Sequence, residues 1–498
     1  MAKKLPIFYS ALLLTGVNLL LRFVGTSFQV YLSGRIGAEG IGLLQLVLSV
    51  GSMAMVAGMA GIRTATMYLT AEQIGRKKPE GILWVLSGCT KYSIVCSTAI
   101  AAGVYIFAPE ICEHWIGHPE VVDSIRLFAA FLPMNCLCGV MVGYFTGANR
   151  IGTLAAVEVA EQFCTMMCTV LLLRCWAGHD PARSCQAVVM GSDAGTVLTL
   201  ISLVILRLLE HQPHSKRISV SRQLYQTAVP LALADNLRTG ISTVENLIVP
   251  KRLALFEGIA SPLAAFGTVC GMVFPILTFP MAILFGLTEL LIPELARCSA
   301  AGSTQRITYL VKQSLRIALL FGAVCSCILY LAAESLCTRL YSSTEAGRYL
   351  RWFAPLAIML YCDAVTDAMI KGLGEQKASV RYNICTNFMD VVLLYLLLPK
   401  LGIVGYFISF TITHVINFIL SLRRLLKITG ITIRLSIPLR VLPAACIAVL
   451  IGGFAGSPVL QLLCGVAVLI CCLYLSGVIH KDDGEWILRL MKIKDRPD

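Results

Sequence analysis

Residues 7–32 read IFYSALLLTGVNLLLRFVGTSFQVYL, an apolar run that carries polar side chains at regular intervals. The polar residues Thr15, Asn18, Arg22, Thr26 and Gln29 are spaced three, four, four and three positions apart. This spacing places all five side chains on one face of a helix. Because a helix needs about 20 apolar residues to cross a bilayer, the stretch predicts a membrane span with one polar stripe.

The composition of the whole chain agrees with a membrane environment. Of its 498 residues, 57% are hydrophobic and 14% are charged, against roughly 45–50% and about 25% in soluble domains. The formal net charge is +13, but the 41 Lys and Arg residues lie mostly in short breaks between apolar runs. This distribution argues against nucleic-acid binding and for a signal of membrane topology.

Fourteen stretches have the length and apolar character of transmembrane helices. They cover residues 7–32, 42–70, 82–108, 121–146, 152–176, 185–209, 223–250, 262–292, 307–332, 347–370, 378–398, 402–422, 436–456 and 459–479. The predicted fold class is therefore an all-α polytopic membrane protein with about 14 transmembrane helices.

The basic residues predict how these spans are oriented. Lys3 and Lys4 precede the first span, and alternate breaks are basic, as at Arg76-Lys77-Lys78. The intervening break at residues 109–120 holds three Glu and no Lys or Arg. The positive-inside rule then places both termini in the cytoplasm. For the tail, residues 481–498, the alternatives are a short helix on the cytoplasmic leaflet and a disordered charged segment.

The chain resembles itself at an offset of roughly 220 residues. Phe131-Leu132-Pro133 opens the fourth span and Phe353-Ala354-Pro355 opens the tenth. The repeat predicts two pseudo-symmetric six-helix lobes, followed by two extra helices and the tail. These parts cover residues 1–212, 213–430, 431–480 and 481–498. Repeats of this kind are typical of transporters with a site near the bilayer midplane.

Arginines mark the candidate substrate site. Arg22 lies near the middle of the first span, and Arg238 lies near the middle of the seventh, on a stripe with Asp235 and Glu245. A charge at the bilayer centre costs about 2.5–3.5 kcal/mol even on insertion scales, so these side chains should face protein or water. We expect a hydrated cavity in which forked guanidinium groups bind an anionic headgroup. The predicted substrate-binding residues are Arg22, Arg63, Arg238, Asn18, Asp235 and Glu245.

Two alternatives to this cavity stay open. Arg238 could instead form an internal salt bridge with Asp235, and Arg63 could extend toward lipid phosphates.

Pairs of acidic residues are candidates for ion coupling. Glu158 and Glu161 are three positions apart in span five, and Asp363 and Asp367 are four apart in span ten. Paired carboxylates on one helix face could bind Na⁺ or H⁺. They could equally be structural partners of neighbouring Arg and Lys residues. Asp193 and Asp390 occur singly in their spans.

Cysteine and proline usage completes the prediction. Most of the 20 Cys lie in apolar runs, and no CxxC pair has metal-binding spacing, so we expect neither a metal site nor a cofactor. Prolines cluster between residues 230 and 293, which predicts bent helices in spans seven and eight.

Several motifs resemble a known family. Gly37-Ala38-Glu39-Gly40-Ile41-Gly42 and Val249-Pro250-Lys251-Arg252-Leu253 resemble the stage V sporulation protein B family of polysaccharide transporters. This family lies in the multidrug/oligosaccharidyl-lipid/polysaccharide exporter superfamily, which includes the lipid II flippases. Many members have Pro where this chain has Arg63. The resemblance implies that spans 1, 2, 7 and 8 line a central cavity and that the last two helices form a groove for a lipid tail.

The resemblance and the arginine stripes together predict a flippase or exporter of a lipid-linked oligosaccharide or peptidoglycan precursor in a bacterial cell membrane. Its partners would be membrane lipid, an anionic polyprenyl-linked sugar and cell-wall or spore-cortex synthesis enzymes. A cation-coupled multidrug exporter and a non-transporting scaffold for cell-wall assembly are the alternatives. The loops are too short for the catalytic site of a glycosyltransferase, so no enzyme is expected.

Overall fold

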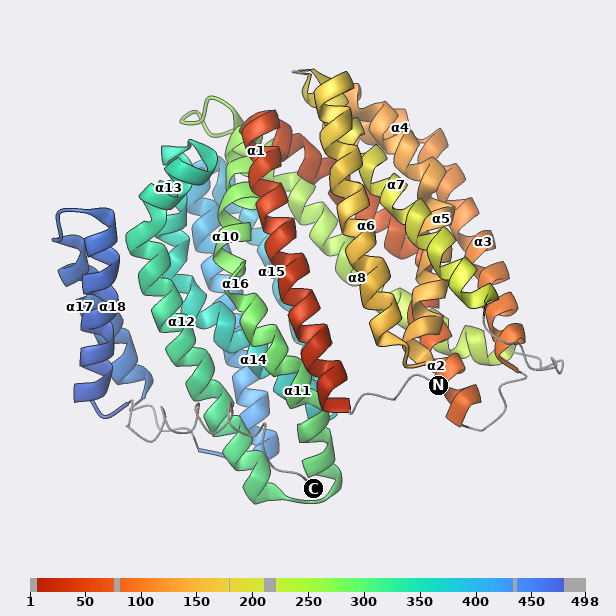
Figure 1. Cartoon of the computed structure of the whole chain (residues 1–498). Coiled ribbons are helices and arrows are strands. Elements are labelled where there is room, and N and C mark those ends of the chain that lie inside the picture. Colours follow the sequence, from red (N-terminus) through yellow and green to blue (C-terminus); the bar gives the residue numbers. More distant parts are fainter. Residues whose placement is uncertain (1–6, 76–80, 179, 210–220, 433–436, 479–498) are drawn as a thin grey trace. The chain divides into compact units, whose positions relative to one another are not determined.

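The computed structural model describes residues 7–75, 81–178, 180–209, 221–432 and 437–478. Within these ranges every regular element is a helix and none is a strand (Figure 1), which confirms the all-α prediction. The helices are α1 (Ile7–Met59), α2 (Ile62–Gly75), α3 (Ile82–Ile106), α4 (Ala108–Glu110), η2 (Ile111–Ile116), η3 (Pro119–Val121), α5 (Val122–Gly147), α6 (Ile151–Leu172), η4 (Leu173–Ala177), α7 (Pro181–Leu208), α8 (Ser221–Leu253), α9 (Pro262–Gly267), η5 (Thr268–Val273), α10 (Phe274–Thr278), α11 (Met281–Ala300), α12 (Thr304–Tyr341), α13 (Thr344–Phe353), η6 (Ala354–Leu356), α14 (Ala357–Gly372), α15 (Gln376–Leu401), α16 (Ile403–Thr429), α17 (Pro438–Gly453) and α18 (Pro458–Leu475).

The first two predicted spans meet at a glycine. α1 consists of two helical runs joined at Gly37, where φ is 73° and ψ is 176°. Glycine adopts this backbone conformation without a steric penalty, so the chain turns sharply there. The second run then stops at Ala60 and Gly61, whose φ angles are 45° and 73°, before α2 begins. The predicted continuous span 42–70 is therefore a broken helix.

The chain divides into two compact units. The first comprises Met1–Pro275 and Asn387–Ser409, and the second comprises Ile276–Thr386 and Phe410–Asp498. The predicted lobes 1–212 and 213–430, like the separate helix pair in 431–480, stay predictions. The predicted tail 481–498 lies outside the described residues.

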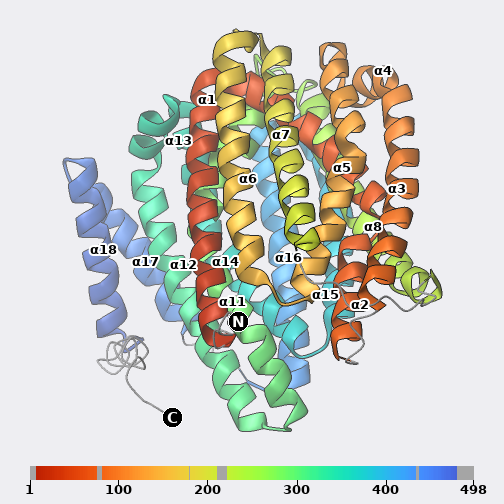
Figure 2. The same ribbon diagram turned by 45° about the vertical axis from the view of Figure 1, so that its right-hand side comes forward.

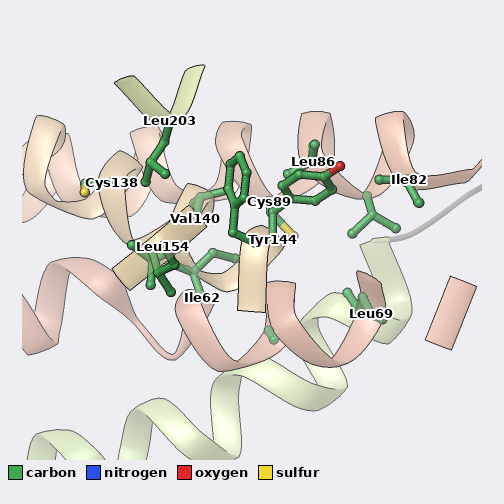
Figure 3. Close-up of a cluster of buried hydrophobic side chains, with 14 of the residues drawn as sticks. Ile62, Leu69, Ile82, Leu86, Cys89, Cys138, Val140, Tyr144, Leu154 and Leu203 are labelled. Carbon is green, nitrogen blue, oxygen red and sulfur yellow. The ribbon is translucent and has the colours of Figure 1, made fainter. Parts of the chain in front are cut away.

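The first unit is held together by an apolar cluster between α2, α3, α5, α6, α7 and α8. Figure 3 shows side chains of this cluster, among them Ile62, Leu86, Tyr144 and Leu203. Ile62 and Leu203 are fully buried, and burial of such a side chain contributes roughly 1.5–3 kcal/mol. The cluster fixes α2 against its neighbours and thus sets the position of Arg63, which follows Ile62 directly.

A seam of glycines joins α1 to α9 and η5 within the same unit. A Cβ at Gly267 would lie 2.0 Å from the Ala38 carbonyl oxygen, and one at Gly271 would lie 2.0 Å from the Ile41 side chain. Only residues without a Cβ allow such close approach of two helices. The Gly-Ala-Glu-Gly-Ile-Gly motif therefore serves, at least in part, the packing of α1 on α9.

The second unit contains the last two helices. α17 and α18 lie side by side in both views (Figures 1 and 2), and both pack on α12. Their shared core includes the buried residues Cys327, Ala448 and Leu469. A Cβ at Gly452 would lie 3.0 Å from Gly465 Cα, so the two helices cross closely at these glycines.

The predicted span eight is bent. Its segments Pro262–Thr278 and Met281–Ala300 meet at an angle of 56°, and η5 adds a π-helical turn. Proline removes an amide donor and disturbs the helical hydrogen bonds before it, so Pro275 and Pro280 account for the break. The prediction of a bent helix is correct for span eight.

The described residues contain ten helices that are long and apolar enough to cross a membrane, or up to eleven if the bent pair counts as one span. The chain is thus a multi-pass membrane protein. The predicted number of fourteen is not confirmed. The two runs of α1 and α2 count together as one candidate span, Leu19–Gly75, although the chain turns at Gly37. α8 carries several charged residues and is not counted, and α17 has only 16 residues.

The internal repeat is visible in the turns that follow α5 and α14. Asn149 and Gly374, 225 residues apart, adopt left-handed φ angles of 57° and 84°. The hydrogen bonds around them match at the same offset: Ala148 N to Tyr144 O with Leu373 N to Met369 O, and Arg150 N to Phe145 O with Glu375 N to Ile370 O. The two halves of the sequence therefore form the same turn at corresponding positions.

Packing beside these turns also repeats. A Cβ at Gly147 would lie 2.5 Å from the Met67 carbonyl oxygen, and one at Gly372 would lie 2.9 Å from the Ile292 carbonyl oxygen. Both pairs again correspond at an offset of 225 residues. The contact of α2 with α5 thus has its equivalent in the contact of α11 with α14.

Candidate functional site

The polar stripe of α1 lies on an accessible side of the helix. Arg22 is exposed in the first run of α1, and its carbonyl accepts a hydrogen bond from Thr26 Oγ1 at 2.9 Å. Further along the stripe, Gln29 Nε2 donates to the Gly271 carbonyl of η5 at 3.1 Å. Asn18 lies in the same run, but its side chain is outside the described part of the structure. Arg22 is not sealed in a packed interior.

α8 carries the second stripe, and it packs on α1. Asp235 and Arg238 are both exposed. Closer to the end of α8, Thr243 Oγ1 donates to the Ser49 carbonyl at 3.1 Å, and Asn246 Nδ2 donates to Ser49 Oγ at 3.0 Å. The stripe thus changes along the helix from exposed charges to polar contacts with α1.

Arg63 stands in the first turn of α2, directly after the break at Ala60 and Gly61. A Cβ at Gly61 would lie 2.4 Å from the Ala228 carbonyl of α8, and one at Gly143 would lie 2.4 Å from the Arg63 carbonyl. These close approaches hold α2 between α8 and α5. The Arg63 side chain is exposed and interacts electrostatically with Glu158 of α6. Exposed arginines therefore occur on α1, α2 and α8, and α8 packs on both of the other helices.

Glu158 and Glu161 have different surroundings. Glu158 faces Arg63, whereas Glu161 Oε2 accepts a hydrogen bond from Thr199 Oγ1 of α7 at 2.8 Å. Thr199 was not among the predicted site residues because a lone threonine in an apolar run carries no distinctive signal. Glu161 is thus bound by the neighbouring helix α7, whereas Glu158 has an electrostatic interaction with Arg63 of α2.

Glu245 belongs to a second acidic cluster that the sequence did not predict as a unit. It interacts with Asp390 of α15, whose Oδ1 accepts a hydrogen bond from Ser409 Oγ of α16 at 2.5 Å. Asp390 is 5% exposed and Tyr406, which also faces the pair, is 3% exposed. Two carboxyl groups that share a buried site cannot both carry a charge at low cost, so the pair favours binding of a proton or a cation.

Asp363 and Asp367 lie in the second unit. Asp363 Oδ2 accepts from Asn417 Nδ2 of α16 at 2.9 Å. Asp367 Oδ2 forms an ion pair with Lys371 Nζ at 2.5 Å, and its Oδ1 accepts from Ser379 of α15. Asp367 thus has the lysine partner that the structural alternative predicts. Asp363 keeps one carboxylate oxygen without a partner among the described residues.

Within the described ranges no group of three or more His, Cys, Asp or Glu residues could hold a metal ion. The candidate site residues are arginines and carboxyl groups on largely apolar helices. Arginine binds phosphate and carboxylate oxygens through forked donors, and buried carboxyl groups bind protons or monovalent cations. Such a site can recognise an anionic group and exchange an ion.

Comparisons with known proteins agree with this architecture. The family model MatE matches residues 15–171 and 259–396, which is more than half of the chain. The Bacillus subtilis (strain 168) protein "Stage V sporulation protein B" is 22% identical over 437 residues, covering 85% of this chain and 84% of that protein. The resemblance found in the sequence motifs is thereby confirmed.

Solved structures share the fold. A structure described as "Lipid II flippase MurJ, inward closed conformation" matches with a TM-score of 0.70 at 13% identity, covering 93% of this chain and 98% of that one. An inward-facing multidrug resistance MATE family transporter of the MOP superfamily matches with a TM-score of 0.64 at 16% identity, covering 84% and 100%. The shared feature is the arrangement of the helices.

Proposed function

This chain belongs to the MatE family, and we propose that it moves an anionic, polyprenyl-linked sugar or peptidoglycan precursor across a bacterial cell membrane. Support comes from the relatives, which include a sporulation protein and a lipid II flippase. The proposal includes both termini in the cytoplasm, a role in cell-wall or spore-cortex synthesis alongside the enzymes of that synthesis, and no enzymatic activity of its own.

One observation carries this proposal: exposed arginines on three helices, with α8 in contact with both α1 and α2. Arg22, Arg63 and Arg238 would each cost about 2.5–3.5 kcal/mol if they faced the hydrocarbon centre. They are therefore best accounted for by a hydrated cavity lined by α1, α2 and α8. Asn18, Asp235 and Glu245 would add polar contacts in that cavity.

A substrate with an apolar tail and a charged head fits a chain of apolar helices that carries a few arginines. A polyprenyl tail is apolar and can remain in the bilayer, so only the charged head needs a polar path. Guanidinium groups would attract the head, and a change in which side of the cavity is open would release it on the other leaflet. The membrane potential would add about 2.3 kcal/mol per charge for each 100 mV. Transport thus requires no chemical change of the substrate.

The test is translocation of a lipid-linked precursor by the reconstituted protein. We expect Arg22→Ala and Arg238→Ala each to slow translocation by at least about tenfold, since loss of a charged hydrogen-bond partner costs about 1.5–3 kcal/mol. Arg297→Ala is the matched control. That side chain lies at the end of α11, is 70% exposed, and makes only a long ion pair of 3.8 Å with Glu294, so its loss should not affect translocation. Translocation at the unmutated rate by both cavity variants would overturn the proposed site.

A cation-coupled multidrug exporter is the second candidate, and the carboxyl clusters favour it. Glu158, Glu161, Asp363 and Asp367 could serve cation coupling in either function, but cationic drugs would be repelled by Arg22, Arg63 and Arg238. Drug susceptibility of cells that express the chain separates the two. A raised resistance that survives all three arginine substitutions would favour drug export.

A further inference from the structure

Asp193 is a carboxyl group that the proposed cavity does not use. It lies near the middle of α7, 12 residues after Pro181 and 15 before Leu208. At about 1.5 Å per residue it is about 18 Å from the nearer end of the helix. The side chain is 3% exposed, and α7 packs on α5 and α6. Asp193 is thus buried in protein at a depth close to the bilayer centre.

One neutral side chain, Asn135, binds this carboxyl group, and Thr196 orients the amide of Asn135. Asn135 Nδ2 of α5 donates to Asp193 Oδ1 at 3.4 Å and also to the Phe131 carbonyl at 3.3 Å. Thr196 Oγ1 donates to Asn135 Oδ1 at 2.9 Å, which fixes the amide with its NH₂ group toward Asp193. Asp193 Oδ2 has no hydrogen-bond partner in the described part of the chain. The carboxyl group therefore has one donor and an unpartnered oxygen.

Charged groups on the surrounding helices lie elsewhere. On α6, Glu161 accepts its hydrogen bond from Thr199, six residues beyond Asp193, and Glu120 of η3 interacts electrostatically with Cys185, near the end of α7 that begins at Pro181. α1 meets α7 at that same end, where Cys185 Sγ donates to the Gly40 carbonyl. Among the described residues, Asn135 is the one side chain that interacts with Asp193. No Lys, Arg or His side chain in the described part of the chain interacts with Asp193.

An isolated carboxylate in such a place is very costly, and a buried group in this situation neutralises instead. We propose that Asp193, held by Asn135 and Thr196, is a proton-binding site within α5, α6 and α7, and that it carries its proton in the conformation described here. Sodium fits less well, because the fixed amide presents hydrogen-bond donors rather than oxygen ligands to the carboxyl group.

The internal repeat supplies an independent argument. In the second unit, Asp363 Oδ2 accepts from Asn417 Nδ2 at 2.9 Å, Asn417 Oδ1 accepts from Thr386 at 3.4 Å, and Asp363 Oδ1 has no partner among the described residues. Asp193 and Asn417 are 224 residues apart, close to the offset of 225 in the matching turns. Asn135 and Asp363 are 228 apart, a difference of about one helical turn. The pair of side chains recurs with acid and amide exchanged.

The site rests on the proposed function in one respect: release of the proton would be a step of the transport cycle. Proton binding itself does not depend on transport, so it can be tested separately. A pH gradient would then act on the N-terminal half of the chain through Asp193, apart from the arginines. An unprotonated Asp193 would favour a conformation that gives it water or a cation.

Infrared spectroscopy of the full chain in lipid bilayers tests proton binding directly. A protonated carboxylic acid has a carbonyl stretch that a carboxylate lacks. We expect this band at pH 7 in the unmutated protein, loss of one group's intensity in Asp193→Asn, and no change in Asp123→Asn, whose exposed carboxylate is the matched control. Thr196→Val keeps the acid and frees the amide, so it should shift the band without removing it.

Two results would overturn the site. Equal band intensity in the unmutated protein and in Asp193→Asn, both folded, would mean that Asp193 is ionised. Loss of the band on adding NaCl would mean that sodium replaces the proton. In proteoliposomes, Asp193→Asn should lose the stimulation of precursor translocation by a pH gradient. If the unmutated protein moves no precursor, the proposed function fails, whereas the infrared result still decides proton binding.

Discussion

The two Asp–Asn–Thr clusters make the same hydrogen bonds in different surroundings. Asp193 on α7 is 3% exposed and meets only neutral partners among the described residues. Asp363 on α14 is followed at four-residue intervals by Asp367, Lys371 and Glu375. Lys371 pairs with Asp367 at 2.5 Å, and Glu375 pairs with Arg424 at 2.7 Å. One acid is isolated, while the other begins a row of charges that continues past the end of α14 to Glu375.

This difference indicates that the two acids differ in how easily ions reach them, although both accept a hydrogen bond from an asparagine. A buried acid with no charged neighbour holds its proton until a conformational change exposes it, whereas Asp363 lies beside a row of charged side chains. The repeat has thus preserved the pairing of an acid with an amide, whereas the hydroxyl comes from helices that do not correspond, Thr196 from α7 and Thr386 from α15. It has not preserved the row of charged residues that runs from Asp363 toward the end of α14.

The largest effect on stability should come from removing the amide. Asn135→Leu leaves Asp193 without its one donor and should lower the free energy of unfolding by about 1–3 kcal/mol, more if the acid is ionised. Asn417→Leu should cost less, because Asp363 still interacts with Lys371. Denaturation of both variants in bilayer mimetics measures the difference. A larger loss for Asn417→Leu would contradict the isolation of Asp193.

A smaller effect is expected from the hydroxyl groups. Thr196→Val removes the donor to Asn135 and should cost about 1 kcal/mol. Thr386→Val should cost less, because the Thr386 hydroxyl is shared with the carbonyls of Tyr382 and Asn383 and reaches Asn417 only at 3.4 Å. The same denaturation measurement applies. Equal losses would show that both hydroxyls orient their amides equally.

The smallest effect on stability is expected from Lys371, in the row of charged residues that follows Asp363. Lys371→Ala should change the free energy of unfolding by no more than about 1 kcal/mol, because the lysine is 39% exposed and Asp367 keeps its hydrogen bond from Ser379. Lys377→Ala, on an exposed position of α15, is the control. A loss well above that of the control would mean that the ion pair holds α14 in place rather than serving as part of an ion path.

Much of the fold could be predicted because helix formation in a membrane is local. The apolar runs predicted α3, α5 and α15 to within a few residues, and the structure has matching turns after α5 and α14 at nearly the offset that the repeat indicated. The break at Ala60 and Gly61 was missed, since glycines occur throughout this run and none of them marks a helix end by itself. The close approach of Gly61 to α8 makes this break understandable only in three dimensions.

For the candidate site, the sequence by itself determined which charged residues lie deep in the membrane, because each must appear as an exception in an apolar run. It could not determine their partners. Asp193 meets a side chain 58 residues away, Asp363 meets one 54 residues away, and Glu245 meets Asp390 on another helix. Asn and Thr cause little disturbance of an apolar pattern, so only helix packing reveals which of them support an acid. The sequence determined where the charged residues lie along each helix. The tertiary structure decided which of them have partners, because those partners come from other helices.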